Sequence, residues 1–163
     1  MLKKIFLVSF FCLITIDLAA QNSIPDIHLK TINGVKIQPS SILNDKEFSI
    51  ISFWATWCIP CINELDAINE LYPSWNEDYS INVLAISTDD SRSRKRVRPL
   101  ISGKNWAFEV YLDENQEFKR SLNISGIPHT IVTYGSKIIH RRIGYSPGEE
   151  KDLINIISNY KKN

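Results

Sequence analysis

The sequence predicts a single α/β domain, and three observations carry this prediction. An apolar strand over residues 48–54 leads into two cysteines, Cys58 and Cys61, and then into a segment with helical periodicity. Further strand-like and helix-like segments alternate along the chain, which ends in an amphipathic helix over residues 149–160. No repeat, linker or low-complexity tract divides the 163 residues, so we expect no second domain.

The segments on either side of the cysteines are a buried strand and an amphipathic helix. Residues 48–54 are apolar and rich in β-branched and aromatic side chains, as in a buried strand. Beyond the cysteines, Ile62, Leu65 and Ile68 recur at spacings of three, which favours a helix with one apolar face. Pro73 is expected to bend or end this helix.

The two cysteines therefore lie where a strand passes into a helix. A helix N-terminus carries partial positive charge and free N–H groups, which favour a thiolate and lower the pKa of the first cysteine. We therefore assign Cys58 as the nucleophile. Cys61 lies one turn further on, where we expect it to be more buried and to close a disulfide on Cys58.

The run from Trp57 to Cys61, placed after an apolar strand, resembles a thioredoxin-fold active site. More closely, the chain is similar to the TlpA/ResA-type extracytoplasmic thiol:disulfide oxidoreductases, from roughly Pro25 to the C-terminus. The resemblance implies a thioredoxin-like three-layer fold with a central mixed sheet, an N-terminal β-hairpin and a central helix–strand insertion. The narrower match rests on residues 53–58, Pro60-Cys61, Glu64, residues 83–87, Leu112-Asp113 and Gly126-Ile127-Pro128.

The other segments fit this plan. Residues 25–37 alternate around Asn33-Gly34, a strong hairpin signal. The remaining expected elements are a turn at 40–46, strands at 81–87 and 108–112, helices at 91–102 and 116–122, a hairpin over 131–142 and the final helix at 149–160. The strand at 108–112 and the helix at 116–122 resemble the central insertion of the family.

A basic run lies in the helical segment 91–102, where five of seven residues between Arg92 and Arg98 are Arg or Lys. A docking patch for an acidic partner is one interpretation. A solvated helix face is favoured over it, because alternate residues spread around a helix.

Residues 1–20 have the pattern of a signal peptide. Lys3 and Lys4 precede an apolar run over residues 5–16, and cleavage is expected after Ala20. A retained anchor is the alternative, but the apolar run is shorter than the roughly 20 residues that a membrane span needs. The sequence therefore predicts a thioredoxin-like domain over residues 21–163, in the periplasm or another extracytoplasmic compartment.

Removal of residues 1–20 leaves 17 basic and 17 acidic residues. This neutral balance favours neither nucleic acid nor a membrane surface as a partner. Cys58 and Cys61 then remain as the only cysteines. A structural staple is the usual role of such a pair in an exported chain, but a loop of two residues constrains the unfolded chain little, so the redox interpretation is preferred.

Substrate binding is assigned around Ile127-Pro128, which matches the position of the cis-proline loop of the thioredoxin fold. In that fold the residue before the proline lies beside the cysteines, where it pairs with an extended substrate segment. Trp54 and Trp57 flank the cysteines and are expected to form an apolar rim, with Trp57 packing on a partner chain.

Glu64 lies three residues after Cys61, so helix geometry brings it near the cysteine face. The family resemblance implies that it tunes the acidity of the cysteines and transfers protons. The alternative is an ordinary acid near a helix N-terminus. Thioredoxins bury an acid six residues before the first cysteine, and this chain has Ser52 there instead.

His129 follows Pro128, a position where the family more often has threonine, and is expected near the cysteines as part of the substrate site. It could tune a thiolate, or bind copper or zinc together with Cys58 and Cys61. Sco-type copper chaperones share the fold, but their cysteines are spaced by three residues. A peroxiredoxin-type peroxidase is disfavoured, because its Pro-x-x-x-Thr-x-x-Cys arrangement is absent.

The sequence thus predicts an exported enzyme that reduces protein disulfides through Cys58 and Cys61, for example in cytochrome c maturation. No cofactor or metal is expected. The partners would be protein disulfide substrates and a membrane thiol-disulfide electron donor, and the chain is expected to be a monomer. The alternatives are a disulfide oxidant or isomerase, and a copper-delivery protein that uses His129.

Overall fold

The computed structural model describes residues 22–162, which form a seven-stranded mixed sheet with helices on both faces. The strand order is β2-β1-β5-β4-β3-β6-β7, in which β4 runs parallel to β3 and β5 and the other neighbours pair antiparallel. The strands are β1 (Leu29–Thr31), β2 (Lys36–Ile37), β3 (Phe48–Trp54), β4 (Asn82–Ser87), β5 (Glu109–Leu112), β6 (His129–Tyr134) and β7 (Lys137–Ile143).

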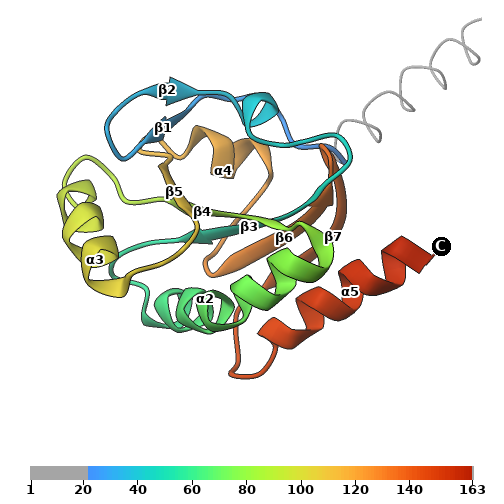
Figure 1. The fold of residues 1–163 in the computed structure, drawn as a ribbon. Coiled ribbons are helices and arrows are strands. Elements are labelled where there is room, and N and C mark those ends of the chain that lie inside the picture. Colours follow the sequence, from blue (N-terminus) through green and yellow to red (C-terminus); the bar gives the residue numbers. More distant parts are fainter. Residues whose placement is uncertain (1–21, 163) are drawn as a thin grey trace, which may run out of the picture.

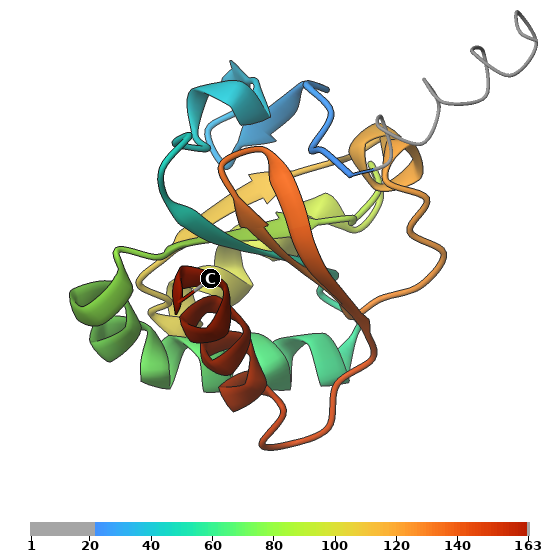
Figure 2. The ribbon, with the colours of Figure 1, turned by 90° about the vertical axis from the view of Figure 1, so that its right-hand side faces the viewer.

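The helices complete three layers, as the sequence predicts (Figures 1 and 2). Two short 3-10 helices are η1 (Pro39–Ser41) and η2 (Arg94–Arg96), and the longer helices are α2 (Ile59–Tyr79), α3 (Val97–Lys104), α4 (Glu117–Ser121) and α5 (Glu150–Lys162). In Figure 1, α2 and α5 lie on one side of the sheet and α4 lies on the other.

Each face of the sheet has its own apolar core. The first core contains both cysteines and lies between the sheet and α2, α3 and α5, with Leu65, Ile68 and Leu153 fully buried. The second core lies on the α4 side, where Phe53 packs on Phe118 with ring centroids 5.5 Å apart. Alternate residues of β3 face the two cores, which explains why every residue of the strand is apolar or small and buried.

The N-terminal hairpin is present, and the strand and helix expected at 108–112 and 116–122 are β5 and α4. β1 and β2 pair around a turn in which Gly34 has φ +83°, and β1 then pairs with β5 to extend the sheet. The left-handed backbone there suits glycine, in agreement with the Asn-Gly signal.

Two expected helix boundaries differ from the structure. Pro73 does not end α2, which continues to Tyr79, because Trp75 beyond the proline is buried and holds the last turns against the core. The helix expected from residue 91 begins as η2 at Arg94. The Asp90 carboxylate accepts hydrogen bonds from the amides of Arg92 and Ser93, as a helix N-cap does, so residues 91–93 form a capped turn that leads into the helical segment.

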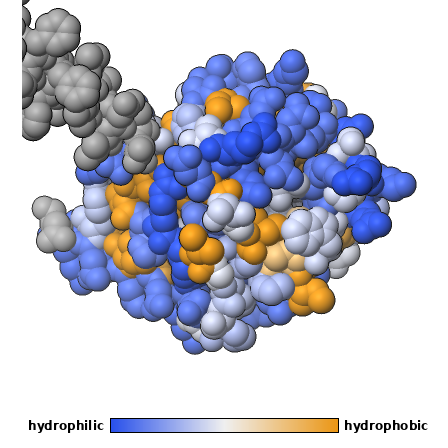
Figure 3. Space-filling view, turned by 180° about the vertical axis from the view of Figure 1, so that it is seen from behind, coloured by the Kyte–Doolittle hydropathy of each residue, from blue (hydrophilic) through white to orange (hydrophobic). Residues whose placement is uncertain are grey.

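The predicted signal peptide, residues 1–20, lies outside the described residues. Within residues 22–162, no helix combines the length and the apolar character that a membrane crossing requires. Figure 3, which views the molecule from behind, shows apolar side chains in patches separated by hydrophilic ones.

Candidate active site

A disulfide joins Cys58 to Cys61 where β3 passes into α2. Cys58 directly precedes the helix, its amide donates to the Ala55 carbonyl, and its own carbonyl accepts from the Ile62 amide. Cys58 is 6% exposed and Cys61 is fully buried. The more accessible sulfur therefore lies at the positive end of a 21-residue helix, which stabilises a thiolate there once the disulfide is reduced.

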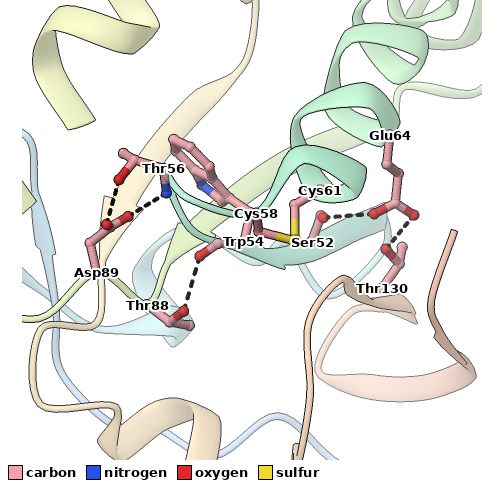
Figure 4. The surroundings of a disulfide bond; sticks show 9 residues. All are labelled: Ser52, Trp54, Thr56, Cys58, Cys61, Glu64, Thr88, Asp89 and Thr130. Atoms are coloured by element: carbon pink, nitrogen blue, oxygen red, sulfur yellow. Dashed lines mark hydrogen bonds between the residues drawn. A yellow bond between two sulfur atoms is a disulfide. The ribbon is translucent and has the colours of Figure 1, made fainter. Parts of the chain in front are cut away.

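The loop before Cys58 is anchored by a buried aspartate (Figure 4). Asp89 Oδ2 accepts from the Thr56 amide at 2.8 Å, and Oδ1 accepts from the Thr56 hydroxyl at 2.7 Å. The Ser87 hydroxyl also donates to Asp89. These bonds fix the loop to the end of β4. Sequence reasoning missed Asp89, although its place two residues after a predicted core strand was an available signal.

Two exposed apolar side chains flank Cys58 in the chain and form the rim of the site. Trp57 is 62% exposed and Ile59 is 70% exposed, one on each side of the nucleophile in the chain. Trp54 was expected in this rim, and that expectation was wrong: Trp54 is fully buried and packs edge-on against Trp106. The alternation of β3 turns it into the first core.

The Ile127–Pro128 peptide bond is cis. Because His129 pairs with Phe53 in antiparallel register, the residues before His129 lie beside those that follow Phe53. Ile127 packs against both apolar cores, one of which contains Cys58 and Cys61. The Ile127–Pro128 segment therefore lies at the same end of the sheet as the loop that leads from β3 to the cysteines.

Glu64 projects from α2 into a buried set of donors, as Figure 4 shows in part. Its Oε1 accepts from Thr130 Oγ1 and from Arg142 Nη2, each at 2.8 Å, and its Oε2 accepts from Ser52 Oγ at 3.3 Å. Glu64 is fully buried among these donors, near the N-terminus of α2.

Burial raises the pKa of Glu64 above its usual value, while the hydrogen bonds and the positive charge of Arg142 oppose that rise in pKa. The sequence reading missed Arg142 as the partner. The available signal was the consecutive pair Arg141-Arg142 in a predicted strand, since alternation turns one of the two onto the covered face of the sheet.

His129 does not join the cysteines, contrary to expectation. Its register partner Phe53 and its second neighbour Ile131 both belong to the second core, whereas Thr130 faces Glu64. The alternation of β6 therefore turns the His129 side chain to the opposite face of the sheet from the disulfide. It is 4% exposed, and burial, with a smaller effect of Arg141, lowers its pKa to about 4.

The copper or zinc site gains no support from this arrangement. Within residues 22–162, no three His, Cys, Asp or Glu side chains form a group that could hold a metal ion. The cysteines and His129 belong to different faces of the sheet, so they do not form the ligand set of the copper-delivery alternative.

Much of the basic run has partners within the chain. Arg92 pairs with Asp90 at 2.8 Å, and Arg94 pairs with Glu114 at 2.6 Å. Arg98 donates to Asn33 at 2.7 Å. These local contacts favour a solvated, internally paired surface over a docking patch.

Comparison with known proteins gives one family match. A family model described as the AhpC/TSA family matches residues 20–142. The chain is 24% identical over 127 residues to the thiol-disulfide oxidoreductase ResA of Bacillus thuringiensis (strain Al Hakam), an alignment that covers 77% of this chain and 70% of that protein. It is 30% identical over 110 residues to the sporulation thiol-disulfide oxidoreductase A of Bacillus subtilis (strain 168), covering 66% and 64%.

Among solved structures, an uncharacterized thioredoxin-like protein from Porphyromonas gingivalis matches with a TM-score of 0.74 and 37% identity. That match covers 85% of this chain and 92% of the other. The expected thioredoxin-like fold is confirmed.

Proposed function

Because the chain belongs to the AhpC/TSA family, we propose that it is an exported thiol-disulfide oxidoreductase that reduces disulfide bonds in other proteins. Relatives that carry the name thiol-disulfide oxidoreductase support a redox enzyme of this kind. The observation that carries the proposal is the Cys58–Cys61 disulfide, with Cys58 at the N-terminus of α2 and flanked in the chain by the exposed apolar side chains of Trp57 and Ile59.

In the proposed reaction, the Cys58 thiolate attacks one sulfur of a substrate disulfide. The substrate's sulfur–sulfur bond breaks and a mixed disulfide forms on Cys58. Cys61 then attacks the Cys58 sulfur, which closes the Cys58–Cys61 disulfide and releases the second substrate thiol. Two electrons pass from the cysteine pair to the substrate, so another thiol protein must reduce the pair again.

The roles of the surrounding residues follow from their positions. Glu64 exchanges protons with the dithiol, because it is the buried carboxylate one helical turn from Cys61. Trp57 and the Ile127-Pro128 segment hold the substrate chain. His129 contributes its backbone position in β6 to this segment, since its side chain faces the other core.

We further propose that residues 1–20 are a signal peptide and that residues 21–163 act as a monomer outside the cytoplasm, re-reduced by a membrane thiol-disulfide donor. Cytochrome c maturation is one setting for such a reductase. The exposed rim formed by Trp57 and Ile59 gives a surface that a polypeptide substrate or donor can cover.

The test is the reduction potential of the Cys58/Cys61 pair, measured by alkylation after equilibration in graded thiol buffers. A potential at or below about −230 mV supports the reductase, because thioredoxin and glutaredoxins lie in that range. A potential between about −120 and −180 mV, as in strong oxidants and isomerases, would reverse the proposed direction of electron flow.

A further inference from the structure

We infer that Arg142 is a positioning residue of the active site: it holds the buried Glu64 side chain as a carboxylate, ready to take up the Cys61 proton. The inference rests on the proposed function, and it adds a residue on β7 that the cysteine motif does not contain.

Two contacts hold the Arg142 guanidinium in place beside Glu64. Its Nη2 lies 2.8 Å from Glu64 Oε1, and its Nη1 donates to the Glu149 carbonyl at 2.5 Å. The side chain of Arg142 is 15% exposed and that of Glu64 is fully buried, so water screens the pair little. The guanidinium is therefore held between the start of α5 and the active-site helix.

The sheet register explains how three donors meet one carboxylate. Ser52 of β3 pairs with Thr130 of β6, and Thr130 pairs with Arg142 of β7. The three residues stand side by side on neighbouring strands and point to the face that α2 covers, where each donates to Glu64. All three donate to the same side chain, and an ionised Glu64 carboxylate can accept all three hydrogen bonds.

Arg142 is the charged member of this set. Burial alone disfavours the carboxylate, and the bond from Arg142 is the largest influence that lowers the pKa of Glu64 against it. Without Arg142, the two neutral hydroxyls would remain to oppose the effect of burial. A protonated Glu64 cannot accept a further proton from the dithiol.

Two other titratable groups on this side of the sheet do not supply that charge. Tyr145 lies close enough to Glu64 to interact electrostatically, but its pKa is raised to about 12 and its hydroxyl donates to Glu150, so it is neutral. His140 lies on the same face of β7 as Arg142, and burial lowers its pKa, so it is neutral at pH 7.

The step that depends on this carboxylate is the resolving step. The Cys61 thiol gives its proton to Glu64, and the Cys61 sulfur attacks Cys58. The Cys58–Cys61 bond forms as the bond from Cys58 to the substrate sulfur breaks. The substrate leaves as a thiolate, which takes the proton from Glu64, so charge and atoms balance.

The experiment compares wild type with Arg142→Met, Arg142→Lys, Glu64→Gln and the Arg142→Met/Glu64→Gln double variant. The first readout is the ¹³C carboxyl shift of Glu64 against pH in the oxidised protein, with the Glu64→Gln spectrum identifying the signal. Arg142→Met is expected to move this titration up by about one to three pH units. Arg142→Lys keeps the positive charge, so its Glu64 titration should lie close to that of wild type.

The second readout is the pH profile of the resolving step, followed as the second release of nitrothiobenzoate after the reduced protein reacts with Ellman's reagent. Arg142→Met should move this profile to higher pH, and should move it no further in the Glu64→Gln background. An unchanged carboxyl titration in Arg142→Met overturns the inference, and so does a profile shift that persists without Glu64.

Arg141→Met is the matched control. Arg141 is the adjacent arginine of β7, but it pairs in register with Ile131 and donates to the Leu122 carbonyl on the other face of the sheet. Arg141→Met should leave both the Glu64 carboxyl titration and the pH profile of the resolving step unchanged. The carboxyl titration needs no substrate, so it tests Arg142 even if the protein fails to reduce protein disulfides, which would count against the proposed function alone.

Discussion

The Ser52 hydroxyl donates to Glu64 Oε2 at 3.3 Å, across the contact between β3 and α2. Figure 4 draws Ser52 between the disulfide and the Glu64 carboxylate. Ser52 occupies the position where thioredoxins bury an acid. In this chain the helix supplies the acid, and a hydrogen bond ties it to that position of the strand.

Replacement of Glu64 by glutamine should move the Cys58 thiolate titration to lower pH. A nearby carboxylate disfavours a second negative charge, and its loss leaves the positive charge of Arg142 uncompensated. The measurement is the ultraviolet absorbance of the thiolate against pH in the reduced protein. Glu70→Gln removes an exposed acid from the same helix and should have no effect. An unchanged titration in Glu64→Gln would remove Glu64 from the mechanism.

The two cysteines should give different products when each is replaced by serine. Cys61→Ser should accumulate a mixed disulfide with a disulfide-containing protein, because Cys58 attacks but nothing resolves the adduct. Cys58→Ser should form almost none, since Cys61 is fully buried. Non-reducing electrophoresis and mass spectrometry detect the adduct. Adducts of equal yield from both variants would contradict the assignment of Cys58 as the nucleophile.

Asp89→Ala should destabilise the protein by about 1.5–3 kcal/mol, because the half-buried Thr56 donors and the buried Ser87 hydroxyl lose the carboxylate that accepts from them. Urea unfolding measures this difference. Asp89→Asn keeps one acceptor oxygen and should cost less. Since the loop carries Trp57 and Cys58, the alanine variant should also react more slowly with protein disulfides. Equal stability of wild type and both variants would show that Asp89 does not hold the loop.

Hydrophobic pattern and turn chemistry were enough to predict the elements of the fold. The apolar run of β3, the Asn33-Gly34 turn and the spacing of Ile62, Leu65 and Ile68 each depend on near neighbours in the chain. Pro73 does not end the helix, and the cause is long-range, because burial of Trp75 keeps the helix intact beyond the proline.

The polar contacts of the site were harder to predict, because they depend on strand register. Arg142 reaches Glu64 across 78 residues of sequence, and Asp89 reaches Thr56 across 33. The same register sends His129 to the α4 side and Thr130 to the α2 side. A shift of one residue in β6 would exchange these two side chains, and the pattern of the strand alone does not fix that choice.

His129→Leu should make the stability of the protein less sensitive to acid. The pKa of His129 is lowered to about 4 in the folded chain, against an unfolded value of about 6.5. Between these pH values the unfolded chain binds a proton that the folded chain does not, so wild-type stability falls as pH falls from about 6.5 to about 4, by up to about 1.4 kcal/mol per pH unit. Leucine removes this contribution and suits the apolar cluster, where both His129 ring nitrogens lack a hydrogen-bond partner among the described residues.

Urea unfolding at a series of pH values measures the slope, and His28→Gln, which changes an exposed histidine, should keep the wild-type slope. An identical slope in His129→Leu and wild type would mean that His129 carries a proton in the folded protein.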